Sequence, residues 1–358
     1  MKIAIYGGSF DPIHIGHIQT AKSVIKELNL DKLIFLPANL SPFKTKKSIT
    51  KNEDRLNMIN LVLEDKMEVS DFELKRGGVS YTIEAVKYFK HKYPNDELYL
   101  IIGSDNLPKL NKWKEIEQIA NLVKIAVVRR EGIINKKNLK KYNGILLKNK
   151  VIEASSTSFK KGYFEVVDDK VADYIQARGL YLDQIVHNCL TAKRAKHSIA
   201  CGSFAAELAK AHKMDAKQAY TAGILHDIAK EWDEKNSREF IAEYLPELKD
   251  VPKHMLHQIC GMLWAKYGYK LADEAILRAI SVHTTMDLQM NALDKILFIA
   301  DKICEGRKFP GIQKLRALCF KDLEAGFKEV VKLNYQVNID KGVVFTDQAL
   351  AIYKKILD

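Results

Sequence analysis

The sequence predicts two domains of different class, an α/β domain with a doubly wound parallel sheet over residues 1–182 and an all-helical domain over 186–358. In the first half, short β-branched and apolar runs alternate with amphipathic stretches of helical length, as in a parallel sheet covered on both faces. From about residue 183 helical periodicity replaces the strand pattern. A chain of 358 residues is long enough for two domains that each bury a core.

The expected elements follow the chain in order. We predict strands at 2–6, 32–37, 97–103 and 123–130, with helices at 16–29, 52–65 and 80–94. In the second half we predict helices at 198–212, 216–232, 272–283 and 291–303. The stretch 177–188 is not rich in proline or glycine, so we expect no flexible linker and two domains that abut.

Composition excludes several classes of protein. No run of 18 apolar residues and no secretory signal is present, which predicts a cytoplasmic protein without a membrane partner. Most of the net charge of +12 lies in the first 182 residues, and the basic run 129–150 has no aromatic residues spaced for base stacking. We therefore favour a solvated surface over a nucleic-acid partner there, and a basic surface also suits polyanionic small molecules. A homo-oligomer is compatible with the sequence.

The string GGSFDPIHIGH, residues 7–17, follows the first predicted strand directly. Gly7 and Gly8 would let backbone N–H groups approach a phosphate at the carboxyl end of that strand, where the next helix offers its positive end. If this helix starts near His14, then His14 and His17 share one face of its first turn, with Gly16 leaving room between them. The alternative is a tight turn whose histidines only cap the helix.

This string is similar to the signature of the nucleotidylyltransferase superfamily, whose H-x-G-H element binds the triphosphate of ATP. Residues 1–182 resemble bacterial nicotinate-nucleotide adenylyltransferases, with further matches at 37–44, 54–59, 80–84, 102–113 and 155–162. The resemblance implies a Rossmann-like fold and adenylyl transfer from ATP, bound with Mg²⁺, to nicotinate mononucleotide. The products would be deamido-NAD and pyrophosphate.

The resemblance also implies roles for the matched residues. His14 and His17 would stabilise the transferring phosphoryl group, and Lys44 would neutralise phosphate. The residues that would bind ATP or the substrate are Gly7, Gly8, Ser9, Phe10, Thr82, Gly103, Asp105, Trp113, Ser156, Thr157 and Lys160. Trp113 would stack on the pyridine ring, the alternative being a core tryptophan. Lys160 stands where the family has arginine, so it keeps the charge and loses the bidentate fork.

In the second half, His226 and Asp227 are adjacent within an apolar stretch, with His197 before them and Asp301 after them. This order resembles the HD superfamily of metal-dependent phosphohydrolases, which implies an all-α HD-domain helical bundle. Imidazole and carboxylate ligands suit first-row divalent metals with open coordination positions.

Two further histidines, His257 and His283, raise the number of candidate ligands to six. Six ligands are more than one metal needs, so we expect two metals bridged by Asp227, with a bridging hydroxide as the nucleophile. The alternative is that His257 and His283 contact substrate or end their helices.

Residues 279–312 are closely similar to bacterial diadenosine tetraphosphate hydrolases of the YqeK type, which cleave their substrate symmetrically to two ADP. This resemblance covers about 186–358 and implies iron as the metal, with Lys230 and Arg307 contacting phosphate. Met286 replaces a glycine common in that family.

Together the two resemblances predict a bifunctional enzyme that uses ATP, nicotinate mononucleotide and diadenosine tetraphosphate. Two alternatives stay open. The folds could serve other substrates, namely nicotinamide mononucleotide or phosphopantetheine in the first domain and a deoxynucleotide or guanosine tetraphosphate in the second. The helical domain could instead be a non-catalytic nucleotide-sensing module.

Overall fold

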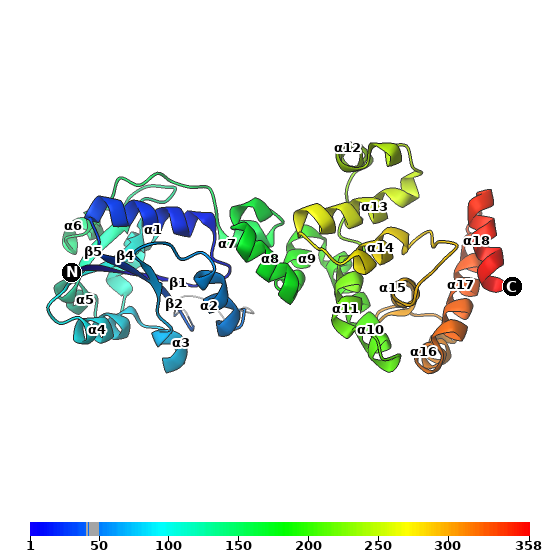
Figure 1. Cartoon of the computed structure of the whole chain (residues 1–358), viewed down its shortest axis with the longest axis horizontal. Coiled ribbons are helices and arrows are strands. Elements are labelled where there is room, and N and C mark those ends of the chain that lie inside the picture. Colours follow the sequence, from blue (N-terminus) through cyan, green and yellow to red (C-terminus); the bar gives the residue numbers. More distant parts are fainter. Residues whose placement is uncertain (41, 43–49) are drawn as a thin grey trace. The chain divides into compact units, whose positions relative to one another are not determined.

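The computed structural model describes residues 1–40, 42 and 50–358, and divides the chain into two compact units (Figure 1). Unit 1 comprises Met1–Phe159 and Tyr163–Tyr174, and unit 2 comprises Lys160–Gly162 and Ile175–Asp358. The division falls inside helix α8 (Asp169–Arg178), a few residues before the limits predicted for the two domains.

Unit 1 is built on a six-stranded parallel sheet in the order β3-β2-β1-β4-β5-β6. The strands are β1 (Lys2–Gly8), β2 (Lys32–Pro37), β3 (Met67–Val69), β4 (Glu97–Gly103), β5 (Lys124–Val128) and β6 (Ile145–Leu146). This confirms the predicted parallel α/β fold. The sequence missed the two edge strands because segments of three and two residues carry too little pattern.

Helices connect the strands of unit 1, and α1 and α4 lie on opposite sides of the sheet (Figure 1). They are α1 (Ile15–Leu28), α2 (Asn52–Asn60), α3 (Phe72–Arg76), α4 (Thr82–Lys92), the 3₁₀ helix η1 (Ser104–Lys112), α5 (Ile116–Leu122), α6 (Lys136–Lys141), α7 (Ser156–Lys160) and the 3₁₀ turn η2 (Phe164–Val166). In this strand order the connections run in opposite directions from β1 and β4, so the ends of these two strands flank the crevice where ligands bind in such folds.

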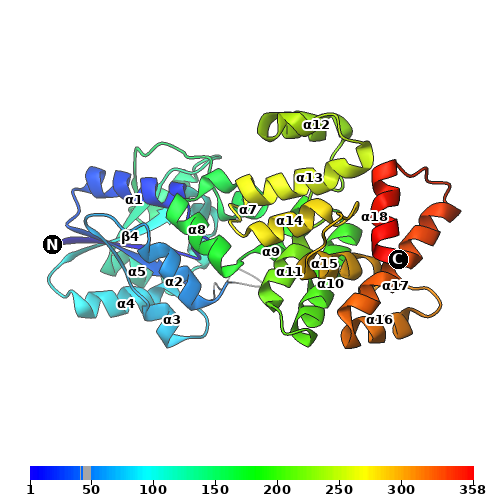
Figure 2. The same cartoon turned by 45° about the vertical axis from the view of Figure 1, so that its right-hand side comes forward.

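Unit 2 contains only helices and loops, as predicted (Figure 2). Its helices are α9 (Leu182–Cys189), α10 (Ala192–Ala211), α11 (Ala216–Leu225), α12 (Glu234–Tyr244), α13 (Leu256–Leu263), α14 (Glu274–Val282), α15 (Ala292–Ile303), α16 (Ile312–Lys321), α17 (Leu323–Asp340) and α18 (Asp347–Leu357). Short turns η3 (Pro246–Leu248), η4 (Lys253–Met255) and the π-helical η5 (Trp264–Gly268) flank α12 and α13.

Two glycines bring α10 and α11 into backbone contact at the centre of unit 2. A Cβ atom on Gly223 would lie 2.6 Å from the Cα of Gly202, so neither helix could approach so closely with a larger residue there. This contact matters because α10 carries His197 and α11 leads directly into His226.

The stretch 177–188 forms the end of α8 and most of α9. Leu182, Ile185 and Val186 on α9 are buried, so this stretch is folded into two helices and the turn between them. Among the described residues, no helix combines the length and the apolar character needed to cross a bilayer.

Candidate active sites

The glycine-rich turn of unit 1 places two imidazoles side by side at the start of α1. His14 is the residue that caps this helix, and its backbone N–H donates a hydrogen bond to Nδ1 of His17 at 3.2 Å. The centroids of the two rings lie 3.5 Å apart. A Cβ on Gly16 would come within 3.0 Å of Nδ1 of His14, so the ring fits because residue 16 is glycine.

His14 is neutral at physiological pH. Burial, and then the positive charge of Arg130, lower its pKa to about 3. Its Nδ1 atom is buried and has no hydrogen-bond partner in the described part of the chain. A neutral imidazole of this kind can offer one hydrogen bond to a phosphate oxygen.

A pocket of about 380 Å³ opens at the ends of β1 and β4. Trp113 forms one part of its wall, and the predicted residues that line it are Gly7, Gly8, Ser9, His17, Thr82, Gly103, Asp105 and Trp113. A Cβ on Gly7 would meet nothing within 4 Å, whereas one on Gly103 would lie 2.1 Å from Oδ1 of Asp105. There is therefore free space beside the backbone of Gly7, whereas the carboxylate of Asp105 lies against the backbone of Gly103.

Five of the predicted residues lie elsewhere. His14 lines a different cavity of about 250 Å³, and Phe10 is buried beneath the turn, edge-on to Tyr6 and His17. Ser156 donates a hydrogen bond to the carbonyl of Pro12 at 2.9 Å, while its neighbour Thr157 is exposed.

Lys160 belongs to unit 2, where its Nζ lies 5.1 Å from the ring centroid of Tyr181. Lys44 lies outside the described residues. The phosphate contacts expected of these two lysines stay predictions.

Arg130 is a pocket residue that the sequence analysis did not single out. It follows β5, and its backbone N–H donates to Oγ of Ser104 at 2.9 Å, while its guanidinium lies 3.5 Å from the hydroxyl of Tyr6. The signal was available, because residues just after a strand next to β4 reach the same edge of a parallel sheet. Arg130 brings a fixed positive charge to a pocket expected to hold phosphates.

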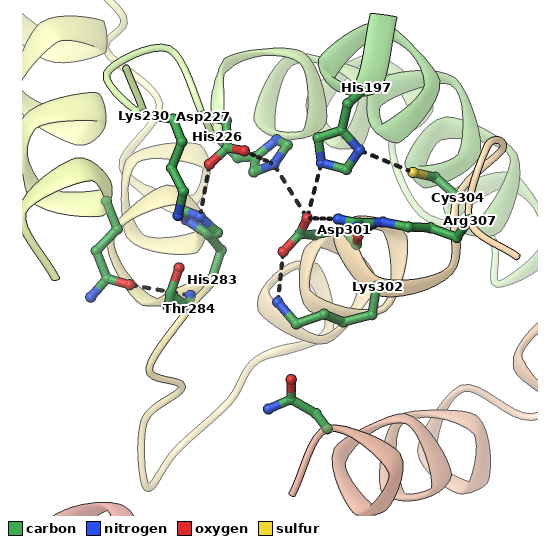
Figure 3. Close-up of polar contacts among 12 residues, drawn as sticks. His197, His226, Asp227, Lys230, His283, Thr284, Asp301, Lys302, Cys304 and Arg307 are labelled. Carbon is green, nitrogen blue, oxygen red and sulfur yellow. Dashed lines mark hydrogen bonds and ion pairs between the residues drawn. The ribbon is translucent and has the colours of Figure 1, made fainter. Parts of the chain in front are cut away.

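In unit 2, Asp227 lies between two groups of histidines (Figure 3). His197, His226 and Asp227 place one ligand atom each within 4.8 Å of one another. Asp227, His257 and His283 do the same. A carboxylate shared by two such groups is what a pair of bridged metal ions requires.

Asp301, on α15, closes the first group. Its Oδ1 atom lies 3.0 Å from Nε2 of His197 and 3.6 Å from Nε2 of His226. All six predicted ligands therefore converge on one centre, drawn from helices far apart in the sequence.

The histidine orientations fit metal binding. The Nδ1 atoms of His226 and His283 lie 2.6 Å and 2.7 Å from the carbonyls of Gly223 and Ile280, so their Nε2 atoms face the centre. Nε2 of His226 is buried and has no hydrogen-bond partner among the described residues. The donor set and this unsatisfied nitrogen both fit a divalent metal.

Cations surround this centre. Lys230 lies 3.0 Å from Nε2 of His257, and Arg307 lies 3.3 Å from Oδ1 of Asp301. Two more, Arg194 at 2.7 Å from Asp227 and Lys302 at 2.6 Å from Asp301, were not singled out from the sequence. Arg194 was detectable, because it precedes His197 by three residues and so shares its helix face.

The charged groups of this centre shift one another's pKa values. Burial opposes ionisation of Asp227, but its histidine neighbours, His226 first, hold its pKa well below the usual range. Burial, and then the charges of His283 and Lys230, lower the pKa of His257 to about 2, which leaves a neutral imidazole able to bind a metal. Burial also lowers the pKa of Lys230.

Two family models match the chain in the same order as the two units. A cytidylyltransferase-like model matches residues 5–162, and an HD domain model matches residues 194–305. The first implies a nucleotide-binding transferase domain, and the second implies a domain that binds divalent metal. The fold and the two sites thus define a fusion of these two classes.

Similar proteins share this combination. A probable nicotinate-nucleotide adenylyltransferase/Ap4A hydrolase of Mycoplasma pneumoniae is 34% identical over 339 residues, covering 92% of this chain and 97% of the relative. One with the same description from Mycoplasma genitalium is 34% identical over 86% of this chain and 88% of its own length. A probable nicotinate-nucleotide adenylyltransferase of Aquifex aeolicus is 45% identical over 152 residues, which cover 41% of this chain and 90% of the relative. The chain belongs to the family of nicotinate-nucleotide adenylyltransferase/Ap4A hydrolases.

Proposed function

We propose that this chain transfers the adenylyl group of ATP to nicotinate mononucleotide in unit 1 and hydrolyses diadenosine tetraphosphate to two ADP in unit 2. The observation that carries the proposal is the presence of both sites in one chain. A pocket lies at the ends of β1 and β4, and Asp227 is shared between two groups of metal-ligating residues.

In the first reaction, a phosphate oxygen of the mononucleotide attacks the α-phosphorus of ATP, and the bond from that phosphorus to the bridging oxygen of pyrophosphate breaks. No covalent enzyme intermediate is needed, so the protein contributes positioning and charge neutralisation. His17 and the backbone of Gly7 and Gly8 would hold the phosphates, and Arg130 would balance their charge. Mg²⁺ bound with ATP would supply further charge neutralisation.

The same pocket would also hold the two nucleosides. Asp105, placed against Gly103, would accept hydrogen bonds from a ribose, and Trp113 would stack on the pyridine ring. Thr82, at the first position of α4, would contribute to binding the pyridine carboxylate. Ser156 and Thr157 would hold phosphate at the start of α7.

For the second reaction, unit 2 would bind two divalent metal ions, which we propose are both iron. The ligands would be His197, His226, His257, His283, Asp227 and Asp301. These ions supply an activated water and neutralise phosphate charge when bound. Lys230 and Arg307 would bind the polyphosphate chain, and Arg194 and Lys302 stand close enough to assist them.

Assays of the full chain test both reactions. Nicotinate mononucleotide with ATP should give deamido-NAD and pyrophosphate, and diadenosine tetraphosphate should give ADP alone. Nicotinamide mononucleotide, phosphopantetheine, a deoxynucleoside triphosphate and guanosine tetraphosphate serve as alternative substrates. Products of ATP plus AMP would contradict symmetrical cleavage.

A single variant tests the metal centre. Asp227→Ala should remove bound metal and abolish hydrolysis, because both ligand groups lose their shared carboxylate. Adenylyl transfer should continue, because the pocket of unit 1 is unchanged, and thermal unfolding checks that unit 2 of the variant is still folded. Metal analysis of wild type should find two ions per chain, and one ion in a fully active enzyme would refute the two-metal arrangement.

A further inference from the structure

We propose that Arg55 is a positioning residue for adenylyl transfer, which holds the phosphate-binding turn and the end of β2 in the geometry that the reaction needs. This inference rests on the proposed function of unit 1. Arg55 does not line the pocket, and no role was expected for it from the sequence.

The guanidinium of Arg55 joins two segments of the pocket wall. Arg55 lies on α2 and its side chain is fully buried. One nitrogen, Nη1, donates hydrogen bonds to the carbonyl of Ser9 at 2.8 Å and to the carbonyl of Ala38 at 2.7 Å. Ser9 and Ala38 follow β1 and β2, and both line the 380 Å³ pocket.

A second set of hydrogen bonds extends this link to a third segment. The other terminal nitrogen of Arg55 donates to Asn52 at 2.6 Å, and Asn52 donates to the side chain of Asn39 at 2.9 Å. The backbone N–H of Asn39 in turn donates to Oγ of Ser80 at 2.9 Å. Ser80 also lines the pocket.

The contact with Ser9 sets the orientation of one peptide in the turn. In a trans peptide the C=O and N–H groups point in opposite directions, so holding the carbonyl of Ser9 also fixes the direction of the Phe10 amide. Phe10 has a φ of 45°, an uncommon conformation for a residue with a side chain. A fixed anchor is therefore valuable at this point in the turn.

The energetic cost of this arrangement points to function. Removing a guanidinium from water is expensive, and a well-packed apolar side chain at a buried position is often equally stable or more stable. The planar fork of arginine can bond several acceptors in fixed directions, which a lysine cannot do. Arg55 uses that property to connect Ser9, Ala38 and Asn52.

The test compares Arg55→Lys and Arg55→Met with Asp54→Asn. Asp54 is the buried neighbour on the same helix, and it accepts a hydrogen bond from the hydroxyl of Tyr174 at 2.8 Å. Each full-length variant is assayed for kcat and KM of adenylyl transfer, for hydrolysis of diadenosine tetraphosphate, and for its melting temperature. The melting temperature reports on the folding of unit 1, and hydrolysis in unit 2 serves as an internal control for the amount of full-length chain.

A positioning role predicts a loss concentrated in kcat. A shift of about 1 Å in the reacting groups can cost on the order of 100-fold in rate, so Arg55→Met should lower kcat about 100-fold with KM changed less than about threefold. Arg55→Lys should recover part of this loss. Asn52→Ala, which leaves the arginine in place, should show a smaller loss of kcat and covers the case in which Arg55 variants fail to fold.

Three outcomes would overturn the inference. Unchanged kcat in Arg55→Lys and Arg55→Met would show that the link is dispensable. Equal losses in Arg55→Lys and Asp54→Asn, tracking the melting temperature, would show a purely structural role. A wild-type chain unable to transfer adenylyl groups would overturn the proposed function itself, and the inference with it.

Discussion

At the scale of single residues, the same side chain type serves three different purposes in this protein. His14 and His17 lie at the start of α1, where we propose phosphate binding, whereas the four histidines of unit 2 that we propose as metal ligands lie near Asp227 and Asp301. The two groups differ in their partners. His17 contacts backbone and an aromatic ring, whereas the histidines of unit 2 lie close to Asp227 and Asp301. His212, with Nε2 2.7 Å from the carbonyl of Cys319, has a structural contact only.

The first residue-scale prediction concerns His17. His17→Ala should lower adenylyl transfer by about 100-fold or more, because the phosphates lose a positioned hydrogen-bond donor. Hydrolysis of diadenosine tetraphosphate should be unchanged, since the six ligands of that site are all in unit 2. Parallel assays of both reactions on one preparation give the answer, and an equal loss of both would contradict separate sites.

A second prediction follows from the lowered pKa of His14. Because its pKa is about 3 when folded and 6.5 in the unfolded chain, the unfolded state binds the proton more readily between these values. The stabilisation that His14 contributes is thus fully present above pH 6.5, and it is lost as the pH falls toward 3. Between pH 6.5 and 5 the free energy of unfolding should fall by about 2 kcal/mol, since one pKa unit corresponds to about 1.36 kcal/mol.

Denaturant unfolding of unit 1 at several pH values measures this effect. His14→Gln should lose less stability than wild type between pH 6.5 and 5, since glutamine does not titrate. Identical pH profiles for the two proteins would show that His14 is not the group responsible.

At the scale of elements, the central parts of the fold could be predicted and the edges could not. The strands β1, β2, β4 and β5 are buried, continuous apolar runs, so they were expected from sequence. The helix expected at 216–232 ends at Leu225, and the chain continues in a turn that carries His226 and Asp227. Helical periodicity alone did not indicate this end of the helix.

The candidate sites show the same limit. Motif residues such as His197 and Asp301 were identifiable because their spacing is characteristic. Arg130 follows a strand beside β4 and Arg55 lies in the matched stretch 54–59, but their contacts depend on which segments the fold brings together. Lys302 is next to Asp301 in the sequence, and the structure shows that its ammonium group contacts that carboxylate.

The contact between α10 and α11 leads to an element-scale prediction. Gly223→Ala should push these helices apart, since the new Cβ would lie 2.6 Å from the Cα of Gly202. We expect a destabilisation of unit 2 by about 1–3 kcal/mol, loss of bound metal and slower hydrolysis, because His197 and His226 separate. Metal analysis, thermal unfolding and the hydrolase assay measure these effects.

Gly261→Ala is the matched control. Gly261 is also a buried helical glycine in unit 2, but a Cβ there would come no closer than 3.4 Å to another atom, at the carbonyl of His226. This variant should keep its metal and its activity. Equal damage in the two variants would mean that close approach of α10 and α11 is not the cause.

At the scale of the whole molecule, the chain joins two units whose proposed reactions both act on adenine nucleotides. The sheet of unit 1 is complete before residue 147, and its pocket is lined only by residues up to Arg130. The first candidate metal ligand along the chain is His197.

The last prediction is therefore that residues 1–182, produced alone, fold and transfer adenylyl groups. All six strands and the pocket residues are present in this fragment, so its core does not need the helical unit. The fragment contains Lys160–Gly162, which the structure groups with unit 2. It also contains Tyr181, so the contact between Lys160 and the ring of Tyr181 can still form. If Lys160 binds phosphate as predicted, KM for ATP in the fragment should stay within about threefold of the full chain. An insoluble or inactive fragment would instead show that the helical half is structurally required.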